Sequence, residues 1–84
     1  MTRDNTIRRL LYQSSHRGCK ETDAILGNFA KENLENFSDE ELKIFEQLLN
    51  EDDWEIYNWV VSKNFPEKYQ NRITDLLLKF DFSK

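Results

Sequence analysis

The chain has 84 residues, enough for one small domain with a single hydrophobic core. Hydrophobic residues make up 38% of it and aromatic residues 13%, which favours a folded core over a disordered chain. The net charge of −4 argues against a general nucleic-acid binder, because such proteins need a basic surface.

The apolar residues recur with helical spacing, and no alternating strand pattern stands out. A first helix is predicted over residues 5–16, with Asp4 or Asn5 as its N-cap. Gly18 then stands where the end of a helix favours a positive φ, which glycine adopts without a steric penalty. The residues expected on the inner face of this helix are Ile7, Leu10, Leu11 and Ser14.

Two further helices are predicted in the middle of the chain. The second begins near Cys19 or Lys20, and the third begins at Ser38-Asp39-Glu40-Glu41. That sequence is a capping box, in which the side chains of Ser38 and Glu41 each accept a hydrogen bond from a backbone N–H that has no helical partner. The residues expected on the buried faces are Ile25, Leu26, Phe29 and Ala30 in the second helix, and Leu42, Phe45, Leu48 and Leu49 in the third.

The last third of the chain predicts two short helices. Asp52-Asp53-Trp54-Glu55 is typical of a helix start, and Phe65-Pro66 indicates another, because proline is tolerated in a first helical turn. The expected buried residues are Ile56, Trp59 and Val60, then Tyr69, Ile73, Leu76, Leu77 and Phe80. The sequence therefore predicts an all-α fold over residues 1–84, a single-domain bundle of about five short helices.

Charge is distributed unevenly along the chain. Residues 1–20 carry five Lys or Arg side chains against the single acid Asp4, whereas residues 32–55 carry ten acids against Lys43 alone. A basic end and an acidic middle would suit a protein partner of mixed charge. Two solvated faces with no partner explain the same distribution equally well.

The sequence also gives expectations about the compartment. The longest apolar runs are three to four residues, so no membrane span is expected, and residues 1–9 do not resemble a signal peptide. The single cysteine, Cys19, allows no intrachain disulfide and no zinc set, and it fits a reducing compartment. We expect a bacterial cytoplasmic protein, or a protein of the mitochondrial matrix if the source is eukaryotic.

The junction of the first two helices holds Arg17-Gly18-Cys19-Lys20-Glu21, which places opposite charges side by side. On physical grounds alone, Glu21 is an ordinary first-turn acid, stabilised by the helix dipole by roughly 0.3–1 kcal/mol. Asp23 can cap locally or pair with a base such as Arg17 or Lys20.

Just before this junction, Arg9 and Tyr12 share a helix face. They either point at a partner together, or Tyr12 packs on Phe29 in the core. His16 and Cys19 flank the junction and could suggest a nucleophile and its base, but the sequence shows no third group to orient them. The residues therefore predict that the chain is not an enzyme.

With Arg9-Leu10-Leu11-Tyr12 before it and residues 22–30 after it, this block resembles the FAD assembly factor family of succinate dehydrogenase. The hallmark of that family is an R-G-x-x-E motif after a helix that carries R-L-L-aromatic. The resemblance covers about residues 7–60. It implies a five-helix chaperone that binds the flavoprotein subunit of succinate dehydrogenase, or of the related fumarate reductase, and promotes its covalent flavinylation.

The resemblance also implies roles for single residues. Arg17 and Glu21 would make polar contacts with the client subunit, and Gly18 would set their geometry. Arg9, Tyr12 and Asp23 would be secondary contributors. FAD would be the cofactor of the client, whose active site performs the chemistry, so this chain would bind no cofactor stably and would be a monomer when free.

A second segment, Asp53-Trp54-Glu55-Ile56-Tyr57-Asn58-Trp59, resembles the family's acidic turn followed by an aromatic-rich helix. One helix face cannot bury all three aromatics, so Trp54 or Tyr57 could be an exposed interface anchor, although core packing is the simpler interpretation. Two other functions stay open: a general helical adaptor, antitoxin-like or regulatory, with unrelated partners, and direct carriage of flavin, which would need an aromatic-lined pocket.

Overall fold

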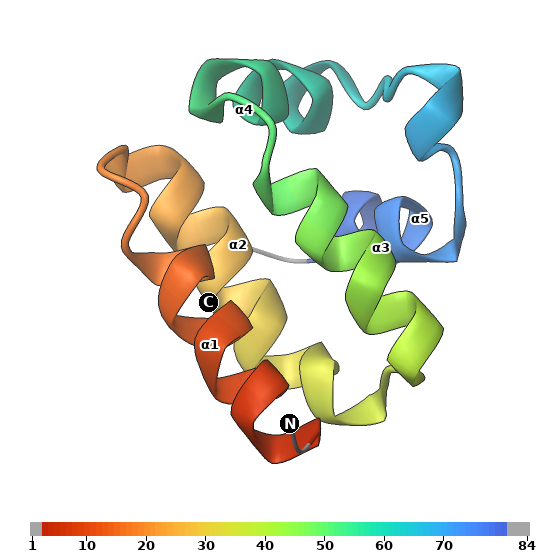
Figure 1. Cartoon of the computed structure of the whole chain (residues 1–84). Coiled ribbons are helices and arrows are strands. Elements are labelled where there is room, and N and C mark those ends of the chain that lie inside the picture. The colour runs from red at the N-terminus through yellow and green to blue at the C-terminus, as the bar shows by residue number, and fades with distance from the viewer. Residues whose placement is uncertain (1–2, 81–84) are drawn as a thin grey trace.

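The computed structural model describes residues 3–80, which form five α-helices and no strand (Figure 1). The helices are α1 (Arg3–Ser15), α2 (Lys20–Asn33), α3 (Asp39–Leu49), α4 (Asp53–Ser62) and α5 (Arg72–Lys79). Two single-turn 3₁₀ helices follow α2 and α4, at Leu34–Asn36 and Glu67–Tyr69. The predicted all-α bundle of about five helices is therefore confirmed.

The helices α1 and α2 form an antiparallel pair, and α4 lies at the end where the turn between them is found (Figure 1). Gly18 in that turn has φ +92°, as predicted, and an added Cβ would meet no atom within 4 Å. The backbone conformation, not crowding, is therefore what favours glycine there. Gly27 differs, because its Cβ would lie 3.1 Å from Cβ of Ser15, so the two helices approach each other closely at this point.

The core takes buried residues from all five helices, and its aromatic cluster is centred on Phe29. The rings of Phe37, Phe45 and Phe80 surround it, with centroids 6.1, 5.9 and 5.6 Å away. Every residue predicted to be buried in the second and third helices is buried, and Leu11, Trp59, Leu76 and Phe80 are partly buried against the core. None of the helices in residues 3–80 has the length and apolar character needed to cross a membrane.

The helix starts in the middle of the chain agree with the prediction. Ser38 and Glu41 form the expected capping box at α3. Asp52 is the N-cap of α4, where its carboxylate accepts a hydrogen bond from the backbone N–H of Trp54 at 3.1 Å.

Two predicted helix starts are wrong. Asp4 and Asn5 lie inside α1, which already includes Arg3, so neither residue is its N-cap. Pro66 precedes a 3₁₀ turn, and α5 begins only at Arg72, because Asn71 and Thr74 form a second capping box. Tyr69 is buried as expected, but from the 3₁₀ turn, where its ring lies 5.6 Å from that of Trp59.

Candidate functional site

The turn between α1 and α2 is fixed to the loop between α3 and α4 by the side chain of Arg17. Its guanidinium donates to the carboxylate of Asp53 and to the backbone carbonyls of Leu49 and Glu51. The carbonyl of Leu49 belongs to the last turn of α3, where carbonyls lack helical partners. We call this arrangement the Arg17 clamp. The Arg17 side chain is only 11% exposed.

Two residues at the start of α2 complete the attachment. The carboxylate of Asp23 accepts a hydrogen bond from the backbone N–H of Arg17 at 2.7 Å. Asp23 therefore pairs locally with Arg17, as the sequence suggested, but through the backbone amide. Thr22 is fully buried, and its hydroxyl donates to the carbonyl of Asp53 at 3.3 Å.

Glu21 has the opposite environment from Arg17. It is exposed in the first turn of α2, and the thiol of Cys19 donates to its carboxylate at a sulfur–oxygen distance of 3.4 Å. The two charges of the motif are therefore separated: Arg17 points into the protein, and Glu21 faces solvent on a turn that Arg17 holds. An exposed carboxylate in a fixed place can accept hydrogen bonds or form an ion pair with another protein.

Tyr12 is 64% exposed and stacks on the ring of His16, with centroids 4.1 Å apart and planes 9° apart. The alternative that it packs on Phe29 in the core is therefore wrong. The two rings border an open hollow of about 320 Å³ beside the Arg17 clamp. The other residues that line the hollow are Gln13, Arg17, Leu49, Asn50 and Asp53.

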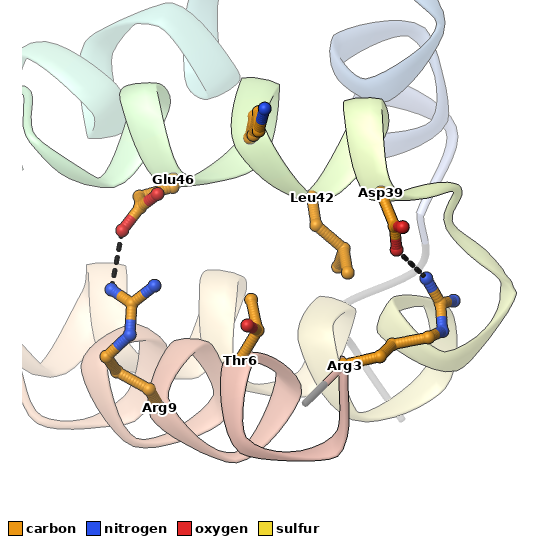
Figure 2. A pocket seen from close by; sticks show the side chains of 7 residues that line it. Arg3, Thr6, Arg9, Asp39, Leu42 and Glu46 are labelled. Carbon is orange, nitrogen blue, oxygen red and sulfur yellow. Dashed lines mark hydrogen bonds and ion pairs between the residues drawn. The ribbon is translucent and has the colours of Figure 1, made fainter. Parts of the chain in front are cut away.

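Arg9 lies in a different place from Tyr12. It forms an ion pair with Glu46 of α3 at 2.5 Å and lines a separate hollow of about 390 Å³ between α1 and α3 (Figure 2). A second ion pair, Arg3 with Asp39 at 2.9 Å, spans the same two helices at the other end of that hollow. The structure therefore does not gather Arg9 with Glu21, Tyr12 and the Arg17 clamp.

Glu51 links the clamp to the 3₁₀ turn before α5. Its carboxylate accepts a hydrogen bond from the Tyr69 hydroxyl and lies 3.5 Å from Nζ of Lys68. The hydrogen bond from Tyr69 lowers the pKa of the Glu51 carboxyl. Burial, together with the adjacent Glu51 carboxylate, raises the pKa of Tyr69 to about 12.

Sequence reasoning missed Asp53 and Tyr69 as supports of this site. The sequence marks Asp53 as part of an acidic helix start and of the segment that resembles the family's acidic turn, but a partner 36 positions away leaves no local signal. The spacing of Tyr69 predicts that its ring is buried, but it gives no information about the hydroxyl. Within residues 3–80, no group of three or more His, Cys, Asp or Glu side chains could hold a metal ion.

Known proteins similar to this chain share one role in their names. The family described as "Flavinator of succinate dehydrogenase" matches residues 8–81. Three relatives, each named "Succinate dehydrogenase assembly factor 2, mitochondrial", come from Candida glabrata, Debaryomyces hansenii and Komagataella phaffii. They are 44%, 45% and 49% identical over 96%, 87% and 76% of this chain. The matched part covers 55%, 54% and 36% of their own lengths, so the chain spans about half of these relatives or less.

Proposed function

This chain belongs to the family of flavinators of succinate dehydrogenase, and we propose that it binds the flavoprotein subunit of that enzyme and promotes its covalent attachment to FAD. The family match over residues 8–81 and the assembly-factor names of the relatives support a role in assembling succinate dehydrogenase. We extend the proposal to the flavoprotein subunit of fumarate reductase.

A binding partner can promote a reaction that another protein performs. If it binds one conformation of the client more tightly than the others, it raises the population of that conformation by the ratio of the affinities. If the partner binds one conformation about a hundredfold more tightly, a saturating amount of partner shifts the equilibrium between client conformations by about a hundredfold. This shift corresponds to about 2.7 kcal/mol. The chain needs no active site and no bound cofactor for this, because FAD and the reacting groups belong to the client.

The observation that carries the proposal is the exposure of Glu21 on a turn that the rest of the protein holds in place. A fixed carboxylate loses little conformational entropy when it binds, so it suits recognition of a donor on the client. We assign the direct polar contact to Glu21.

Arg17, Gly18 and Asp23 contribute by positioning. The donors of Arg17 are directed at internal acceptors, Gly18 supplies the positive φ, and Asp23 accepts the backbone N–H of Arg17. We assign Tyr12 a second contact with the client, because its exposed ring lines the adjoining hollow. Arg9 would act at a distance from these residues, from the α1–α3 hollow.

The names of the relatives support a mitochondrial location, the second of the two compartments expected from the sequence. In either compartment we propose that the chain is monomeric until it meets its client. A gel-filtration measurement of the free protein tests this part of the proposal.

Substitution of Glu21 tests the function directly. Purified flavoprotein subunit is incubated with FAD and either wild-type protein, Glu21→Ala or Glu21→Gln, and covalent flavin is read as fluorescence in a denaturing gel. We expect the wild type to increase covalent flavin and Glu21→Ala to remove most of that increase, by about tenfold, which corresponds to about 1.4 kcal/mol of lost binding. Glu21→Gln separates the charge from the hydrogen-bonding capacity, because it keeps the size and an acceptor.

The matched control is Glu32→Ala, which removes another exposed acid from the opposite end of α2. It should flavinylate the client as well as the wild type does, and circular dichroism should show that all variants are folded. If the wild type does not raise covalent flavin, the proposed function is wrong, and the helical adaptor with another partner becomes the better interpretation. If the wild type raises covalent flavin and Glu21→Ala raises it equally well, the function stands and Glu21 is not its contact.

A further inference from the structure

The outer face of α4 is apolar although it faces solvent. Trp54 and Val61 are 58% and 61% exposed, and Tyr57, which is half-buried and also packs against the core, lies between them in the sequence. The rings of Trp54 and Tyr57 meet edge to face, with centroids 5.8 Å apart. We call these three residues the α4 outer face. Their spacing of three and four positions places them in one stripe.

The fold does not need Trp54 to hold α4 in place. Ile56 and Val60 face the core from the opposite side of the helix and are buried. Because the core is packed without Trp54, its large ring remains available to another molecule. Tryptophan is one of the residues enriched among those that contribute most to the binding energy of protein interfaces.

The Trp54 end of the stripe is negatively charged. Residues 51–55 include four carboxylates, whereas Lys63 follows the stripe at the other end of α4. Two of them already have partners within the chain: Asp53 pairs with Arg17, and Glu51 pairs with Tyr69 and Lys68. The other two, Asp52 and Glu55, are exposed on either side of Trp54 in the sequence. Charge complementarity therefore favours an occupant with an apolar side chain flanked by Lys or Arg.

The stripe is continuous with the candidate functional site. Asp53, the first residue of α4, accepts the Arg17 guanidinium through its carboxylate and the Thr22 hydroxyl through its carbonyl. Trp54 is the next residue along the chain. The start of α4 and the turn that presents Glu21 are thus held as one unit, so a single partner can contact both.

We propose that the α4 outer face is a second docking surface for the flavoprotein subunit, and that it receives a segment of that subunit which carries an apolar side chain between basic ones. This inference rests on the proposed function and adds to it the surface and the chemistry of the client segment. Glu21 and Trp54 then make two separate contacts with one client.

The test measures the dissociation constant for purified flavoprotein subunit with wild type, Trp54→Ala, Glu55→Lys and Glu21→Ala. We expect Trp54→Ala to weaken binding about tenfold or more, as loss of an interface anchor does. Glu55→Lys should weaken it several-fold at low salt, with a smaller effect in about 0.5 M salt because exposed charges are screened. The matched control is Glu32→Lys, which makes the same change in net charge at the far end of α2.

The outcomes separate this inference from the proposed function. If the wild type and Trp54→Ala bind equally well while Glu21→Ala binds weakly, the docking surface is wrong and the function stands. If the wild type does not bind the subunit, both are wrong. The face could instead be covered by a second copy of the chain. A wild-type dimer that Trp54→Ala converts to a monomer, with client binding unchanged, would overturn the proposal.

Discussion

Arg3 and Arg17 fix the loops that lead into α3 and α4 with the same pattern of hydrogen bonds. Arg3 donates to the carboxylate of Asp39 and to two backbone carbonyls of the segment that precedes α3. Arg17 does the same with Asp53 and two carbonyls of the segment that precedes α4. In both cases the aspartate is the first residue of a helix and lies 36 positions after the arginine. The two carbonyls that accept from each arginine lie 32 and 34 positions after that arginine. We call the first arrangement the Arg3 clamp; Figure 2 shows its Arg3–Asp39 pair.

The two clamps differ in their access to water. The Arg3 side chain is 41% exposed, whereas that of Arg17 is 11% exposed. An exposed ion pair contributes little to stability, because water solvates both charges when the pair separates. Removing one partner of a buried pair costs much more, because the remaining charge and carbonyls lose their partner without gaining water. The same hydrogen bonds should therefore stabilise the protein strongly only around Arg17, beside the candidate functional site.

The largest expected effect is that of Arg17→Ala. It leaves Asp53 and the backbone carbonyls of Leu49 and Glu51 without their donor, so we expect the free energy of unfolding to fall by about 3 kcal/mol. Urea unfolding followed by far-UV circular dichroism measures this. Arg17→Lys keeps the charge but has no planar fork for three acceptors, so it should recover only part of the loss.

The Lys variant also keeps the comparison informative if Arg17→Ala does not fold. A loss below about 1 kcal/mol for Arg17→Ala would mean that this clamp resembles an exposed ion pair, which would contradict the difference in burial described above.

The second largest expected effect is a loss of stability at high pH. It arises because the two clamps differ at the residue that supplies their second carbonyl. In the Arg3 clamp this residue is Phe37, which packs in the core, whereas in the Arg17 clamp it is Glu51, which accepts from Tyr69. The pKa of Tyr69 is raised from 10 to about 12. Protonated Tyr69 therefore makes its full contribution to the free energy of unfolding below pH 10. That contribution is lost as the pH rises toward 12, by up to about 1.4 kcal/mol per pH unit.

Stability measured in steps between pH 9 and 12, for the wild type and Tyr69→Phe, checks this. The wild type should lose stability relative to Tyr69→Phe over that interval, because the unfolded chain releases the Tyr69 proton at a lower pH than the folded protein does. Parallel pH profiles for the two proteins would show that Tyr69 does not titrate as the structure indicates.

The smallest effect is expected for Arg3→Ala. Its loss should be about 0.5–1 kcal/mol and should shrink in high salt, as for other exposed ion pairs. The measurement is the same urea titration at low salt and at about 1 M salt. A loss as large as that for Arg17→Ala, with no salt dependence, would mean that burial does not distinguish the two clamps.

The parts of the fold that depend on neighbours in the sequence could be predicted. The capping box of Ser38 and Glu41 lies within one turn, and the buried face of α3 follows from the spacing of Leu42, Phe45 and Leu48. The predicted start of α5 is too early because the sequence holds two helix-start signals. Pro66 is tolerated at a helix start, but Asn71 and Thr74 satisfy each other's backbone N–H groups and thereby fix the start of the helix.

The candidate site could be predicted only in part. The residues of the turn and the positive φ of Gly18 follow from local rules, and so does the preference of α2 for an acid such as Glu21 in its first turn. The inward direction of Arg17 depends on acceptors 32 to 36 positions away, and no local rule places them. Tyr12 illustrates the same limit, since helical spacing left its exposure undecided.

The close approach of α1 and α2 at Gly27 has a consequence for how the sequence can change. The Cβ of Ser15 fills the gap between the helices, and a Cβ on residue 27 would lie 3.1 Å from it, closer than an ordinary van der Waals contact. Positions 15 and 27 therefore share one fixed volume. A larger residue at 27 requires a smaller one at 15, or the two helices must separate, and the turn that carries Glu21 lies between these positions. A substitution at one of these positions therefore limits which residues fit at the other, although neither position belongs to the surface that we assign to the client.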